Sequence, residues 1–177
     1  MSVQLQPSFL TERFQNMTFK ENVERSMSQD STDSDFEIQI VEREDKNDVI
    51  NLARRFFNRD EPVNECISLT GPDGRCADLE DYIISTLEEG TSLKAVAGSK
   101  LVAFSMNGII HRDDPNEKVI VENPKFQLIM DFLHFNNTQC DIFKKYPNVE
   151  KAMSVKIISV DSCMRGKGVA TKLVEKT

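Results

Sequence analysis

The stretch SVDSCMRGKGVAT, residues 159–171, decides the fold of this chain. The apolar residues before it predict a buried strand over Ala152 to Val160, and the apolar residues from Val169 onward predict a helix. A turn with two glycines joins them and would leave unpaired backbone N–H groups at the positive end of that helix. Arg165 and Lys167 add positive charge to the same turn. This arrangement suits an anion such as a phosphate.

The spacing of the glycines in this turn differs from that of two common nucleotide-binding motifs. The GxxxxGK[ST] order of a P-loop is absent, and so is the GxGxxG of a dinucleotide-binding fold. The stretch therefore gives no support for mononucleotide hydrolysis. On spacing alone one alternative stays open, in which Gly166 and Gly168 only turn the chain between a strand and a helix.

The rest of the sequence predicts further strands and helices. Residues 36–41 alternate apolar with polar side chains as a half-buried strand does, and Asp45 is the expected N-cap of the helix that follows. Asn123 is the expected N-cap of a later helix, with Pro124 in its first turn. The remaining expected elements are a short helix through Leu79, Ile83 and Leu87 that Gly90 ends, a hairpin of residues 93–97 and 101–110 around the turn 98–100, and a charged loop at 111–122.

Composition and charge exclude several classes of protein. The chain has 177 residues, of which 39% are hydrophobic, and this is enough for one packed domain. No apolar run approaches the roughly 20 residues of a membrane helix, and no targeting peptide is recognisable, so we expect a soluble, cytoplasmic protein without membrane contact. The net charge of −7 argues against a nucleic-acid partner, which would need a basic face.

The cysteines and histidines do not suggest a metal site. The four cysteines are far apart without CxxC spacing, and the two histidines lie near none of them in the sequence. These residues are Cys66, Cys76, Cys140, Cys163, His111 and His134. We expect reduced thiols that pack as small hydrophobic groups, and no bound metal.

The chain divides into an extension and one domain. Residues 1–35 are polar, rich in Ser, Gln and Asn, and end in an acidic stretch, which predicts a disordered N-terminal extension. A short amphipathic helix between Phe9 and Phe19 is the alternative for part of it. Order is expected to begin at Phe36, so residues 36–177 form the predicted domain.

Residues 165–170, RGKGVA, resemble the R/Q-x-x-G-x-G/A pattern with which acetyltransferases of the GNAT superfamily hold the pyrophosphate of coenzyme A. Three further stretches resemble the insect-type arylalkylamine, or dopamine, N-acetyltransferases in particular. They are RFFNRDEPVN (55–64), IFKKYP (142–147) and IISVD (157–161). The resemblance implies an α/β (α+β) GNAT acyltransferase fold with a mixed central sheet flanked by helices. It also implies a domain truncated after the coenzyme A motif helix, because a complete one continues with another strand, a helix and a hairpin.

The activity that the resemblance implies is transfer of an acetyl group from acetyl-CoA to the primary amine of an arylalkylamine, of the dopamine, serotonin or tryptamine type. Acetyl-CoA would be the only cosubstrate, without a metal. Positions that match the coenzyme A site are Ile158, Ser159, Val160, Arg165, Gly166, Lys167, Gly168, Val169 and Ala170. Glu61 matches the glutamate that takes the amine proton through ordered water. Phe56 and Phe57 are candidates for the walls of the amine pocket, with core packing as their alternative role.

Other activities remain compatible with the sequence. One is a noncatalytic fragment that binds acyl-CoA or a partner, and another is a GNAT enzyme that acetylates polyamines. His111 could be proposed as a base, but its place beside Arg112 and Asp113 is typical of an exposed loop histidine. We expect a monomer whose partner is a small-molecule amine.

Overall fold

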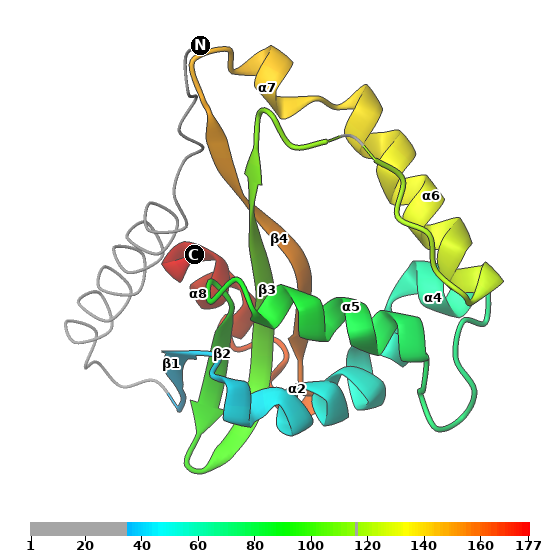
Figure 1. Ribbon diagram of the computed structural model, residues 1–177. Helices are drawn as coiled ribbons and strands as arrows, with labels where there is room; N and C mark the ends of the chain where they lie inside the picture. The colour runs from blue at the N-terminus through cyan, green and yellow to red at the C-terminus, as the bar shows by residue number, and fades with distance from the viewer. Residues whose placement is uncertain (1–34, 116) are drawn as a thin grey trace.

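The computed structural model describes residues 35–115 and 117–177, and their centre is a four-stranded sheet. The strands are β1 (Glu37–Ile40), β2 (Leu93–Ala97), β3 (Lys100–His111) and β4 (Lys151–Val160). They lie in the order β1-β2-β3-β4, and each neighbouring pair is antiparallel. Figure 1 shows β3 and β4 as the long strands at the middle of the molecule. The expected N-terminal extension, apart from Asp35, lies outside the described residues.

Helices and helical turns connect the strands and cover both faces of the sheet. In chain order they are η1 (Arg43–Asp45), α2 (Lys46–Leu52), η2 (Ala53–Phe57), α3 (Asn58–Asp60), α4 (Pro62–Cys66), α5 (Ala77–Leu87), α6 (Pro124–Gln139), α7 (Ile142–Lys145), η3 (Ser162–Met164) and α8 (Val169–Lys176). The helices α2 and α5 contact β3 on one face, and α8 contacts β2, β3 and β4 on the other (Figure 1).

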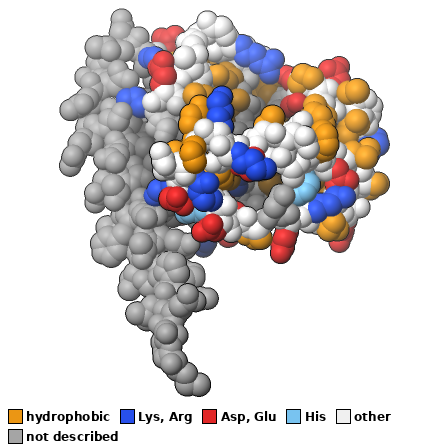
Figure 2. Space-filling view, turned by 90° about the horizontal axis from the view of Figure 1, so that it is seen from above, with side chains coloured by type: hydrophobic (Ala, Val, Ile, Leu, Met, Phe, Trp, Pro, Cys, Tyr) orange, Lys and Arg blue, Asp and Glu red, His pale blue; other side chains and the backbone are white. Residues whose placement is uncertain are grey.

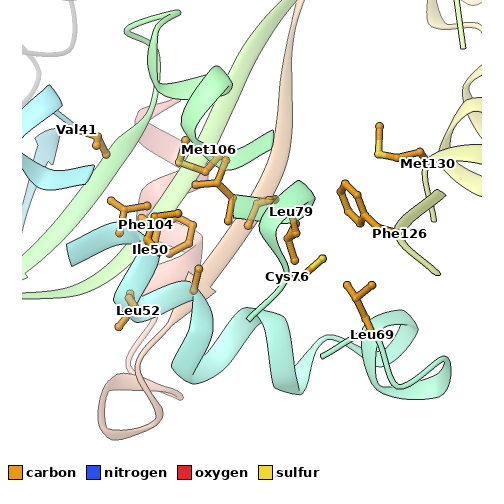
Figure 3. Packing of buried hydrophobic residues seen from close by; sticks show 14 residues of the cluster. Val41, Ile50, Leu52, Leu69, Cys76, Leu79, Phe104, Met106, Phe126 and Met130 are labelled. Atoms are coloured by element: carbon orange, nitrogen blue, oxygen red, sulfur yellow. The ribbon is translucent and has the colours of Figure 1, made fainter. Parts of the chain in front are cut away.

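Two clusters of buried apolar side chains hold these layers together. The larger one contains Phe104 and Met106 of β3 together with Leu79 of α5 and its neighbours, as Figure 3 shows. In the second, Leu173 of α8 packs with Leu93 of β2. Full burial of one such side chain contributes roughly 1.5–3 kcal/mol to folding, so the apolar faces of α5 and α8 fix where these helices lie.

The helix α6 leaves much of its apolar surface exposed. Phe126 and Met130 are buried in the larger cluster, whereas Leu128, Phe132 and Phe135 are more than half exposed. Figure 2, which views the molecule from above, shows exposed hydrophobic side chains among charged ones on this side. The helix α6 therefore presents apolar side chains both to the core and to solvent.

The expected strands and helices form, with two local differences. Asp45 directly precedes α2, but its carboxylate does not cap that helix. It accepts the backbone N–H of Glu42 at 2.7 Å and binds Nζ of Lys94, because helical geometry already begins at the turn η1. The β2–β3 hairpin turns in two residues rather than three, since Lys100 pairs with Ala97.

The first helix contains a π-turn that its sequence does not reveal. The helical path runs from α2 through the π-turn η2 into α3, where one extra residue per turn rotates the side chains that follow. The π-turn holds both Phe56 and Phe57 and leads to Asn58, which is buried and donates to the carbonyl of Gly74 at 2.9 Å. Such turns often occur next to functional sites.

The strand β4 has one neighbour, β3, within the described part of the chain. Val155 on this edge strand is 41% exposed, although its sequence predicted a buried strand. An edge strand presents unpaired backbone N–H and C=O groups along its open side. None of the helices in 35–115 and 117–177 combines the length and the apolar character needed to cross a membrane.

Candidate functional site

The strand-to-helix junction lies at one end of β4 and contains two glycines in the left-handed region. Gly166 has φ +78° and Gly168 has φ +75°, and Gly168 is the N-cap of α8. A Cβ added to either glycine would meet no atom within 4 Å, so these positions need glycine for its backbone and not for lack of room. The backbone of this turn is therefore open to a ligand.

Arg165 joins this turn to a distant part of the chain. Its guanidinium donates to a carboxylate oxygen of Asp60 at 2.6 Å and to the carbonyl of Val160 at 3.2 Å, and it lies over the ring of Phe56. Asp60 immediately precedes Glu61, the expected base. The fold thus places the glycine turn beside a segment about 100 positions earlier in the sequence.

Two other basic residues, one in the turn and one in α8, face different partners. Lys167 pairs with Asp35 at 3.7 Å, and Lys172 lies over the ring of Phe36 at 5.3 Å. Both contacts connect α8 and its turn to the start of β1. The positive charges surround the turn, but Arg165 is the one that connects it to the Asp60 segment.

Asp161 holds the end of β4 in place, a role that sequence reasoning did not assign. Its side chain is only 4% exposed, accepts Nζ of Lys100 at 2.7 Å and lies 3.7 Å from Arg55. It also accepts the backbone N–H of Cys163 at 3.1 Å. The hydrogen bond from Lys100 lowers the pKa of this carboxyl to about 2, although burial acts in the opposite direction.

A pocket of about 240 Å³ lies between α4, α5, α6 and β4. Most of its wall is apolar or aromatic, and among the residues that line it Glu61 and Lys156 are the charged ones. The complete lining is Phe57, Glu61, Val63, Asn64, Leu79, Tyr82, Phe126, Ile129, Met130, Phe132, Leu133, Lys156 and Ile157. Figure 3 shows Leu79, Phe126 and Met130 around this region. An apolar cavity with a few polar groups is the usual form of a small-molecule site.

Glu61 reaches this pocket because the chain turns between α3 and α4. Its backbone is extended, and one carboxylate oxygen accepts the N–H of Asn64 at 2.7 Å, which caps α4. Pro62 occupies the first position of α4, where its missing N–H costs nothing. Asp60 therefore ends α3, Glu61 and Pro62 begin α4, and Glu61 also lines the pocket.

The two phenylalanines of the π-turn have separate surroundings. Phe57 lines the pocket with Glu61, whereas Phe56 does not line it and instead lies beneath Arg55 and Arg165. Tyr82 and Phe126 face each other edge to face at 6.4 Å across the pocket wall, and burial raises the pKa of Tyr82. The pocket thus has an aromatic wall made from three different elements.

The remaining polar candidates lie elsewhere. His111 is exposed at the end of β3 and borders a different cavity, near Arg112 and α7. All four cysteines are free, and burial raises the pKa of Cys76. Among the described residues, no three His, Cys, Asp or Glu side chains are grouped so that they could hold a metal ion.

Comparison with known proteins gives similar solved structures, while no family model matches the sequence. Arylalkylamine N-acetyltransferase 2 from Aedes aegypti is 30% identical, with a TM-score of 0.73 over 81% of this chain and 68% of that one. Mosquito arylalkylamine N-acetyltransferase like 5b is 25% identical, with a TM-score of 0.67 over 79% and 68%. Drosophila melanogaster polyamine N-acetyltransferase, which forms N-acetylagmatine, is similar in fold, at 19% identity and a TM-score of 0.66 over 79% and 67%. The chain spans about two thirds of the length of these proteins.

Proposed function

Because the chain belongs to the GNAT superfamily of N-acetyltransferases, we propose that it transfers an acetyl group from acetyl-CoA to the primary amine of an arylalkylamine. The observation that carries this proposal is the position of Glu61. Glu61 lines an aromatic pocket, and the preceding residue, Asp60, contacts Arg165 of the glycine turn. In this proposal, the site for the amine therefore lies beside the site for the phosphates of coenzyme A.

The glycine turn fits the pyrophosphate of coenzyme A. The backbone around Gly166 and Gly168 is open, the N-terminus of α8 attracts negative charge, and Arg165 is half exposed beside it. Residues Ile158 to Val160 belong to an edge strand, so their backbone can pair with the amide groups of the pantetheine arm. Acetyl-CoA supplies the activated acetyl group, and the residues of this turn and strand bind and orient it.

Glu61 is the group that we propose removes the proton from the amine. A primary alkylamine is mostly protonated at neutral pH and cannot attack a carbonyl until it loses that proton. A carboxylate can accept the proton directly or through one water, provided that it lies within hydrogen-bond reach of the amine. The N–H of Asn64 fixes one oxygen of Glu61 at 2.7 Å, so the direction of the carboxylate is set before the amine arrives.

The shape of the pocket favours an aromatic amine. Phe57, Tyr82 and Phe126 offer ring surfaces, and aliphatic side chains of α6 complete the wall. An aromatic ring buried there gains hydrophobic contact and edge-to-face packing. Phe56 does not line the pocket and has a different role in this proposal, because its ring supports Arg165 beside the coenzyme A turn.

An assay with labelled acetyl-CoA and a panel of amines tests the proposal. We expect labelled amide from tryptamine and dopamine, a smaller yield from agmatine, and loss of most activity in Glu61→Gln. Glu65→Gln is the matched control, because Glu65 is exposed on the same short helix and does not line the pocket. Bound acetyl-CoA without any product would instead identify a noncatalytic acyl-CoA-binding protein. A preference for agmatine would identify a polyamine acetyltransferase.

A further inference from the structure

We propose that Lys156 determines acceptor specificity: it occupies the carboxylate of Glu89 and keeps a positive charge at the amine pocket, so that amines with a second positive charge are disfavoured. This inference rests on the proposed function, because it concerns the acceptor of that same site.

A bulge in β4 brings Lys156 to the pocket. Along the β3–β4 pairing, Met106 lies opposite Ile157 and Asn107 lies opposite Val155, so Lys156 has no partner on β3. A residue inserted in this way redirects the side chains around it. In consequence, both Lys156 and the next residue, Ile157, line the pocket, although neighbours in a regular strand would face opposite sides.

The ammonium group of Lys156 is bound to Glu89, which follows the end of α5. Nζ lies 2.8 Å from Oε1 of Glu89, and Oε2 of the same carboxylate accepts the N–H of Ile109 at 2.8 Å. The two side chains are 23% and 34% exposed, so the pair is partly shielded from water. Both oxygens of Glu89 are therefore engaged, and Glu89 itself does not line the pocket.

Gly108 of β3 provides the space in which this ion pair lies. A Cβ at this position would come within 2.5 Å of Nζ of Lys156 and 2.9 Å of Oε1 of Glu89. The backbone of Gly108 has an ordinary φ, so its lack of a side chain serves the ion pair and not a turn. The sequence therefore makes room for Lys156 to cross β3 and reach Glu89.

These contacts determine whether a second positive charge on the acceptor amine is favoured or disfavoured in the pocket. The charged residues that line the pocket are Glu61, from the turn before α4, and Lys156, from β4. With its reacting amine at Glu61, agmatine would place its guanidinium near the ammonium of Lys156 without a carboxylate to receive it. An aromatic ring would meet Phe57, Tyr82 and Phe126 in the same space. Removal of Lys156 would leave Glu89 as a carboxylate that a second positive charge could approach.

The test compares acetylation of agmatine and tryptamine by the full chain and three variants. Lys156→Met removes the charge and keeps the length of the side chain, and Lys156→Met/Glu89→Gln also removes the carboxylate. Lys151→Met is the control, because Lys151 is an exposed residue of the same strand that does not line the pocket. Calorimetric titration of each amine in the presence of coenzyme A measures binding separately from turnover.

We expect Lys156→Met to raise the ratio of kcat/KM for agmatine to that for tryptamine by about fivefold or more, mainly through KM, which is the scale of one partly exposed ion pair. The double variant should keep only part of this gain, because the positive charge of Lys156 is still absent while the carboxylate of Glu89 is gone, and Lys151→Met should not change the ratio. An unchanged ratio in active Lys156→Met, or a gain of the same full size in the double variant, would overturn the inference alone. A parent protein that neither acetylates nor binds either amine would overturn the proposed function as well.

Discussion

Replacement of Asp161 by asparagine should destabilise the folded chain by about 2 kcal/mol at neutral pH. In the folded protein the pKa of Asp161 is lowered from 3.8 to about 2, chiefly by the hydrogen bond from Lys100. Each pKa unit corresponds to about 1.4 kcal/mol, and the half-exposed partners Lys100 and Arg55 are partly screened by water, which gives about 2 kcal/mol in all. Asparagine keeps the oxygen that accepts the N–H of Cys163, so the variant removes mainly the charge.

The pH dependence of this effect follows from the direction of the shift. Because the pKa of Asp161 is lower in the folded state, its contribution is fully present above the ordinary value of 3.8 and is lost as the pH falls toward 2. Urea unfolding at pH 7, 4 and 3 should show the difference between parent and variant nearly unchanged at pH 4 and reduced to about half at pH 3.

Asp81→Asn is the control for this measurement, because Asp81 is exposed on α5. It should change stability by less than about 0.5 kcal/mol at every pH. A loss of that small size in Asp161→Asn, or a loss that is the same at pH 7 and pH 3, would refute the reasoning that the buried carboxylate anchors the end of β4 through its charge.

Two further predictions concern the glycine turn and the N-terminal residues. Gly168→Asp should weaken acetyl-CoA binding, measured by calorimetry, by about two orders of magnitude, because it sets a carboxylate against the phosphates and removes charge-assisted hydrogen bonds. Gly168→Asn is its control, since Asn tolerates the same positive φ without the charge and should bind much more tightly; equal affinities would exclude a charge effect at this turn. Deletion of residues 1–34 should leave the melting temperature within a few degrees of the parent value, because their sequence has no periodic apolar face, and a large drop would show that they pack on the domain.

Features with a local cause could be predicted from the sequence. The left-handed glycines Gly166 and Gly168, the cap of α6 by Asn123 and the strands of the hairpin all follow from residues that are neighbours in the chain. Asn123 accepts the N–H groups of Lys125 and Phe126, as its residue type and position indicate. The similarity of the fold to that of arylalkylamine N-acetyltransferase 2 confirms the predicted GNAT architecture.

Features that depend on residues far apart in the sequence could not be predicted in this way. The contact between Arg165 and Asp60 joins positions that only the folded chain brings together. Lys156 reaches the pocket through a bulge. Side chains of a regular strand alternate between its two faces, and a bulge interrupts this alternation, so the face on which a side chain lies cannot be predicted from the sequence there. The π-turn has a similar effect in the first helix, where it separates the surroundings of Phe56 and Phe57.

The measurement that tests the central claim most directly is the pH dependence of tryptamine acetylation by the parent protein and Glu61→Gln. If Glu61 removes the amine proton, the variant should lose about 10²-fold or more of kcat/KM near neutral pH, and the loss should shrink at alkaline pH, where more amine arrives without its proton. Glu65→Gln should follow the parent profile. Full activity in Glu61→Gln, with an unchanged pH profile, would contradict the account.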